Sequence, residues 1–252
     1  MRTHKPRGAE SGSAPLGRHD LAAGRLRMPL IVTTLLVLFA FWPWSPRHAQ
    51  QDGLLETGNE LRSTILGARE RALSSGTPVA VLIYPDFETS SHQRGRVIVY
   101  QDACRDFFTR ALACGVAYAT YDPAVPAYGH AGSLRSKVIS TLDLPAGVTL
   151  SPRTGIPATL SAPFAGVRID LACSFCGSTG GAVQFDSQGH PSFYSLDGGA
   201  VTGPFKVTGG ATLSLRATPT AATTTAEEQT LMILASTGAV AIIASDAAGQ
   251  RP

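Results

Sequence analysis

Charged residues are scarce in this chain of 252 residues, since Asp, Glu, Lys and Arg together make up 15% of it and lysine is nearly absent beside arginine. The 26 glycines and 17 prolines supply many turns. The length is enough for one large domain or two small ones, and for a proper core. Few charges and many turn residues favour a globular fold rich in strands, either β or α+β.

A surplus of positive charge is missing from the chain after residue 27. Residues 1–27 hold six Lys and Arg against two acidic residues, which leaves fifteen basic and sixteen acidic residues for the remainder. Proteins that bind nucleic acid carry basic residues as a patch on the folded domain. The stretch from Glu227 to Pro252 has three acids and only one basic residue, Arg251. We therefore expect no nucleic acid among the partners.

Motifs that carry catalysis are absent as well. The sequence has no G-x-S-x-G elbow, no Walker glycine loop and no H-E-x-x-H, and its six histidines show no metal-ligand spacing. Asp102 and Asp106 bracket Cys104, which leaves a calcium site and a plain acidic loop as alternatives. We expect a protein that is not an enzyme, with no cofactor and no metal.

Only one apolar run reaches membrane length. Residues 28–44, "MPLIVTTLLVLFAFWPW", contain no charge and end on Trp42 and Trp44, where an interfacial aromatic belt would lie. We predict a transmembrane segment there, between a basic cytoplasmic head or leader (1–27) and a linker (45–56). A cleaved secretory signal is the alternative, with a poor cleavage site before Gln50.

The chain has only four cysteines, and an exported domain would hold them as disulfides. We favour the pairs Cys104–Cys114 and Cys173–Cys176. A four-thiolate zinc site needs two C-x-x-C pairs and finds one, "CSFC". A redox C-x-x-C needs a helix N-terminus to lower the pKa of a thiol, whereas "CSFCGSTGG" runs into glycines. Zinc binding and thiol-disulfide exchange are the alternatives.

An amphipathic helix is predicted over residues 57–75, because Leu54, Leu61, Ile65, Ala68 and Ala72 fall on one stripe of a 3.6-residue helix. Thr57 and Glu60 match a capping box, and Gly76 before Pro78 matches a left-handed stop. Short strands separated by turn residues follow it. The strand candidates are residues 79–84, 96–100, 116–121, 147–150, 167–171, 182–185, 211–217, 230–236 and 239–244.

The predicted fold class is therefore α+β: an N-terminal membrane helix and an amphipathic helix packed on an antiparallel β-sheet domain. That domain covers residues 57–245, and residues 246–252 form a tail. The helix stripe of Leu61, Ile65, Ala68 and Ala72 is the expected cover for the sheet.

The stretch "NELRSTILGARERALSSGTPVAVLI" (59–83) resembles the end of the first helix in the H-type minor pseudopilins of type II secretion and the FimT-like minor type IV pilins. Looser matches follow in the same order at residues 95–102, 144–150, 183–189 and 232–240. The residues that fit the helix-to-strand motif are Asn59, Glu60, Leu61, Ala68, Arg69, Ala72, Gly76, Pro78 and Val79.

This resemblance implies a pilin-like fold and a non-enzymatic component of a type II secretion or type IV pilus system, contributing to filament assembly or protein secretion. The implied partners are other pilin-like subunits, the assembly platform and the inner membrane. The implied location is a single pass through the inner membrane, with the C-terminal domain in the periplasm. Two alternatives stay open: a thiol-disulfide protein that uses Cys173 and Cys176, and a secreted β-rich binding module.

The prepilin leader departs from the family pattern. When "MPLIV" is set against the prepilin "FTLIE", Arg27 stands where the leader peptidase expects glycine, Met28 follows the cut, and Val32 stands where the assembly glutamate belongs. The resemblance implies that this glutamate pairs with a neighbouring amine, because an unpaired carboxylate in lipid is costly. Val32 cannot form that pair, so the leader is degenerate.

Overall fold

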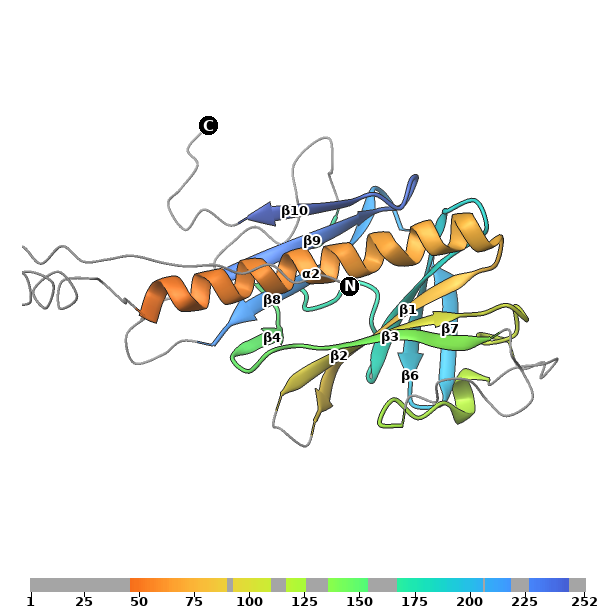
Figure 1. The fold of residues 1–252 in the computed structure, drawn as a ribbon, viewed down its shortest axis with the longest axis horizontal. Coiled ribbons are helices and arrows are strands. Elements are labelled where there is room, and N and C mark those ends of the chain that lie inside the picture. The colour runs from red at the N-terminus through yellow and green to blue at the C-terminus, as the bar shows by residue number, and fades with distance from the viewer. Residues whose placement is uncertain are drawn as a thin grey trace, which may run out of the picture. The chain divides into compact units, whose positions relative to one another are not determined.

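The computed structural model describes residues 46–89, 93–109, 117–125, 136–153, 167–205, 207–218 and 227–244 (Figure 1). The predictions for the basic head, for the segment 28–44, and for Arg27, Met28 and Val32 lie outside these residues. Cys114 and the tail 246–252 lie outside them too.

One α-helix occurs in this part of the chain, α2, which spans Pro46–Ser75. It begins inside the expected linker, and Pro46 suits this place because the first turn of a helix needs no backbone N–H from proline. Thr57 lies within the helix and donates its hydroxyl to the Gly53 carbonyl at 2.7 Å, so the expected capping box is not formed. The helix ends at Gly76, whose φ is 65° and whose N–H donates to the Ala72 carbonyl at 3.0 Å. This left-handed stop agrees with the sequence.

The described residues also form ten strands in two antiparallel sheets. Sheet A has the order β3-β2-β1-β5-β6-β7, and sheet B has the order β10-β9-β8-β4. Sheet A contains β1 (Val79–Glu88), β2 (Arg94–Gln101), β3 (Lys137–Asp143), β5 (Gly180–Phe185), β6 (Pro191–Asp197) and β7 (Ala200–Phe205). Sheet B contains β4 (Val148–Leu150), β8 (Gly210–Ala217), β9 (Glu228–Leu234) and β10 (Val240–Ala244).

Helix α2 covers one face of both sheets. It contacts β1, β2 and β5 in sheet A and all four strands of sheet B. Figure 1 shows it running alongside β9 and β10, with its N-terminal end projecting beyond the strands. Leu61 and Ile65 are fully buried in the cluster that joins the helix to the sheets. Burial of each such side chain stabilises the domain by about 1.5–3 kcal/mol relative to an exposed position.

Sheet A is buried on its other face as well. Along β1, Val79, Val81 and Ile83 face the helix, whereas Ala80 and Leu82 belong to a second cluster. Residues 102–109 and 117–121, which include the short 3-10 helix η1 (Tyr118–Thr120), cover this second cluster with aromatic side chains such as Phe107 and Tyr118. Because both faces of β1 are covered, its apolar residues run without interruption instead of alternating with polar ones.

The predicted fold class is wrong for the described residues. They are mostly antiparallel β-sheet with the single α-helix α2, and none of their helices is long and apolar enough to cross a membrane. The helix has one buried stripe, and charged residues such as Glu56, Glu60 and Glu70 occupy its exposed side. A helix with this distribution lies on a core instead of passing through lipid.

The individual strand predictions are partly correct. Seven of the expected segments overlap strands β1, β2, β4, β5, β8, β9 and β10. The prediction over 116–121 is wrong, because Tyr118–Thr120 form η1, and residues 167–171 contain no strand. Strands β3, β6 and β7 were not predicted. Their serines, threonines, aspartates and prolines are the residues that also mark turns.

Candidate functional site

The predicted packing residues of the helix all lie against the domain itself. Leu61, Ile65, Ala68 and Ala72 are each at most 2% exposed and belong to the cluster that the helix shares with both sheets. This stripe is therefore occupied within the subunit. Any contact between α2 and another protein has to use the opposite side of the helix.

That opposite side is exposed from Glu56 to Ser74. Its members follow the helical repeat, and all but Asn59 are small or acidic: Glu56, Asn59, Glu60, Ser63, Gly67, Glu70 and Ser74. We call this set the outer stripe. A Cβ built at Gly67 would meet nothing within 4 Å. The outer stripe thus carries three carboxylates, and the exposed residues Arg62 and Arg71 lie on the helix beside it.

Arginines at the flanks of the helix attach it to the sheets. Arg62 Nε donates to the Val240 carbonyl at 3.2 Å, and Arg69 Nε donates to the Gly189 carbonyl at 3.3 Å. Arg69 also lies 3.7 Å from Glu70, whose side chain is 72% exposed. Such an exposed ion pair contributes little to stability. Arg69 therefore binds its own domain, whereas the side chain of Glu70 faces solvent.

The structure joins Cys173 to Cys176 by a disulfide, with the Cα atoms 5.3 Å apart. Cys104 is also disulfide-bonded. The Cys173–Cys176 loop lies on β8, where the Ser174 N–H donates to the Thr212 carbonyl at 3.0 Å and the Thr212 N–H donates to Ser174 Oγ at 2.8 Å. The chain then enters β5 and no helix, so the feature that lowers a thiol pKa in redox C-x-x-C sites is missing at this loop.

The carboxylate of Asp102 is used by its own loop. It accepts hydrogen bonds from the backbone N–H groups of Asp106 at 3.2 Å and Phe107 at 3.3 Å, and from Gln184 Nε2 at 3.4 Å. Burial raises the pKa of Asp102 above its ordinary value, although the two backbone donors act in the opposite direction. Within the described ranges, no three His, Cys, Asp or Glu side chains come together as metal ligands. The geometry favours the acidic-loop alternative for Asp102 and Asp106.

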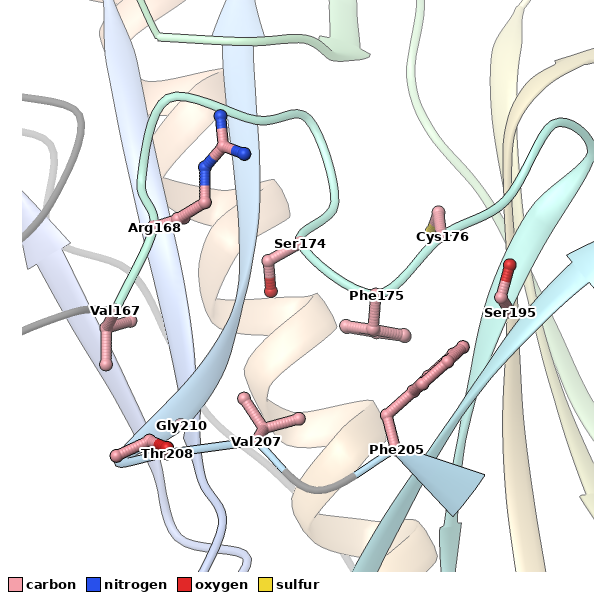
Figure 2. A pocket seen from close by; sticks show the side chains of 10 residues that line it. All are labelled: Val167, Arg168, Ser174, Phe175, Cys176, Ser195, Phe205, Val207, Thr208 and Gly210. Carbon is pink, nitrogen blue, oxygen red and sulfur yellow. The ribbon is translucent and has the colours of Figure 1, made fainter. Parts of the chain in front are cut away.

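A cavity of about 400 Å³ lies where sheets A and B diverge (Figure 2). Its walls come from the disulfide loop, from β6 and from the crossing between β7 and β8. The apolar side chains that line it are Val167, Phe175, Phe205 and Val207, joined by Cys176. The sequence did not indicate this site, because its walls are brought together only by the pairing of strands that lie far apart in the chain.

No protein-family model, no curated protein and no solved structure matches this chain. The described residues offer two surfaces that a function can use. The outer stripe of α2 is an exposed helical surface, and the cavity is large enough for a small ligand.

Proposed function

We propose that the chain is a non-enzymatic, pseudopilin-like component of a type II secretion or type IV pilus system, which contributes to filament assembly or protein secretion. It acts at the inner membrane, with the described domain on the periplasmic side. Its partners are other pilin-like subunits and the assembly platform.

The observation that carries this proposal is the division of α2 into two faces. The face with Leu61 and Ile65 is buried against both sheets, whereas the outer stripe is exposed from Glu56 to Ser74. The helix passes directly into β1 through Gly76, Thr77 and Pro78, within the segment that resembles the pseudopilins. A helix held in this way presents one continuous side to neighbouring helices.

Small residues on the outer stripe support close approach of a second helix. Ser63 and Gly67 are separated by about one helical turn. Ser63 has a small side chain and Gly67 has none, so a partner helix can come close at both positions. The carboxylates of Glu60 and Glu70 flank them and favour a partner with basic side chains at the edges of its contact surface.

A cross-linking experiment in the native host tests the proposal. The variant Ser63→Cys places a reactive thiol on the outer stripe, and Ser178→Cys places one on an exposed turn away from the helix. We expect Ser63→Cys to form adducts with another pilin-like subunit, identified by mass spectrometry, and Ser178→Cys to form none. Adducts of Ser178→Cys alone, or none from either variant, would contradict the proposal.

The N-terminal sequence and intact mass of the protein from host membranes test the assembly route. A mature N-terminus at Met28 supports processing as a prepilin, despite Arg27 and Val32. A chain that begins at Gln50 would be a secreted module, and this result would contradict filament assembly.

A further inference from the structure

The cavity between the sheets is lined by both apolar and polar side chains, and the apolar ones form two of its walls. Figure 2 shows Phe175, Phe205 and Val207 turned toward a common space. Phe175 is buried and lies 5.3 Å, centroid to centroid, from the ring of Phe193, so this wall belongs to the core. Phe205 is 40% exposed at the edge strand β7. One wall is therefore fixed by the core, and the other offers an aromatic face to an occupant.

Two polar side chains at the cavity, Arg168 and Ser195, already have hydrogen-bond partners within the protein. Arg168 donates to both carboxylate oxygens of Asp170, at 3.0 Å and 2.6 Å. Ser195 Oγ donates to Asp197 Oδ2 at 3.1 Å. Among the described residues, Arg168 is the only charged side chain that lines the cavity, and it already has its own carboxylate. A charged occupant would find no other opposite charge among these lining residues.

Thr208 and Ser174 are the other two polar side chains among the described residues that line the cavity. Thr208 is exposed to solvent, whereas Ser174 is half-buried. Ser174 Oγ accepts the Thr212 N–H at 2.8 Å, and among the described residues no acceptor takes its hydroxyl proton. A hydroxyl both accepts and donates. Figure 2 shows this oxygen pointing toward Val207, into the space between the apolar walls. The hydroxyl can therefore donate to an acceptor oxygen on an occupant.

We propose that this cavity binds a small uncharged molecule with an aromatic or aliphatic body and one acceptor oxygen, such as a ketone or an ester. The volume of about 400 Å³ falls in the usual range for small-molecule sites, and the lining of apolar walls with one directed polar group is typical of them. The inference is independent of subunit assembly, because every wall belongs to one chain.

Fluorescence titration of the full chain with prodan, a neutral naphthalene ketone, tests the site. We expect saturable binding of one molecule per chain. The variant Val207→Trp fills the cavity and should abolish this binding, whereas Val125→Trp makes the same change at an exposed position that does not line the cavity and should leave it unchanged. No saturable binding, or equal binding by both variants, overturns the proposal.

Two further variants separate a directed site from a general apolar surface. Phe205→Ala removes the exposed wall, which costs the fold little because that side chain is partly in solvent, and it should weaken binding of prodan. Ser174→Ala should weaken prodan about fivefold through the lost hydrogen bond. It should not change the affinity for N-phenyl-naphthylamine, which has no carbonyl. Equal losses for the two probes overturn the role of Ser174, and prodan binding that Phe205→Ala leaves intact overturns the site.

Discussion

Arg153 and Glu228 form an ion pair inside the protein, with Nε and Oε2 3.8 Å apart and side chains only 4% and 8% exposed. Arg153 Nη1 also donates to the Thr230 hydroxyl at 3.2 Å, and Arg216 Nε lies 3.9 Å from Oε1 of the same glutamate. Burial lowers the pKa of Arg153, and the charge of Glu228 opposes that shift. The carboxylate of Glu228 thus offsets the desolvation penalty of the charged Arg153 guanidinium.

The variant Glu228→Gln should destabilise the domain by about 3 kcal/mol, because it leaves the buried Arg153 without its carboxylate. Urea denaturation followed by circular dichroism measures this change. Glu60→Gln makes the same substitution on the exposed outer stripe and should change the free energy of unfolding by less than about 0.5 kcal/mol. Equal stabilities for the two variants would show that the buried pair contributes nothing.

The titration of Asp102 should lower the free energy of unfolding as pH rises. Its pKa is raised in the folded state, chiefly by burial, so the folded protein holds this proton more tightly than the unfolded chain. The resulting stability is fully present below the ordinary pKa of 3.8 and is lost as pH rises through the raised value.

The variant Asp102→Asn removes the titration and should flatten this slope. Denaturation in urea at a series of pH values measures it for wild type and variant. Asp86→Asn, at an exposed position of β1, should keep the wild-type slope. A slope that persists in Asp102→Asn would assign the dependence to another group.

Two glycines respond in opposite directions to the same substitution. At Gly181, an added Cβ would lie 2.7 Å from Cys176 Sγ and 2.8 Å from Phe175 Cδ2, and the disulfide holds both side chains in place. Gly181→Ala should therefore destabilise the domain by about 1–3 kcal/mol.

Gly67 lies in the exposed middle of α2 with open space around it, so Gly67→Ala should stabilise the domain by about 0.5–1 kcal/mol. Thermal unfolding compares them, and a shift of the same sign for both would contradict this account.

Periodicity explains what was predictable about the fold. The buried positions Leu61, Ile65, Ala68 and Ala72 repeat with the helical period, so the stripe could be found without knowing what covers it. Strand β1 was found because burial of both faces makes its residues uniformly apolar. Strand β6 shows only two consecutive buried residues, Ser195 and Leu196, and so gave no comparable signal.

Local motifs were less informative than periodicity. Thr57 and Glu60 have the spacing of a capping box, but the same spacing occurs within helices, and here Thr57 bonds back to Gly53. Pro46 begins α2, which shows that a proline in the sequence marks the start of a helix as readily as its end. The cavity could not be predicted, because Phe175, Phe205 and Val207 meet only through the pairing of distant strands. No pattern along the chain encodes that meeting.

The two faces of α2 should separate folding from assembly. Ile65 is fully buried between the sheets, so Ile65→Asp places an unpaired charge in the core and should unfold the domain, which circular dichroism would detect as loss of the cooperative transition. Ser63→Asp also introduces an aspartate, but at an exposed position of the outer stripe. This variant should keep the cooperative unfolding transition. If the outer stripe contacts pilin-like subunits, Ser63→Asp should nevertheless reduce secretion or pilus formation in the native host, because it adds a carboxylate to a contact surface. A folded Ile65→Asp variant would refute the placement of the helix. A folded Ser63→Asp variant with full secretion would remove the outer stripe from the proposed function, while the helix packing would remain as described.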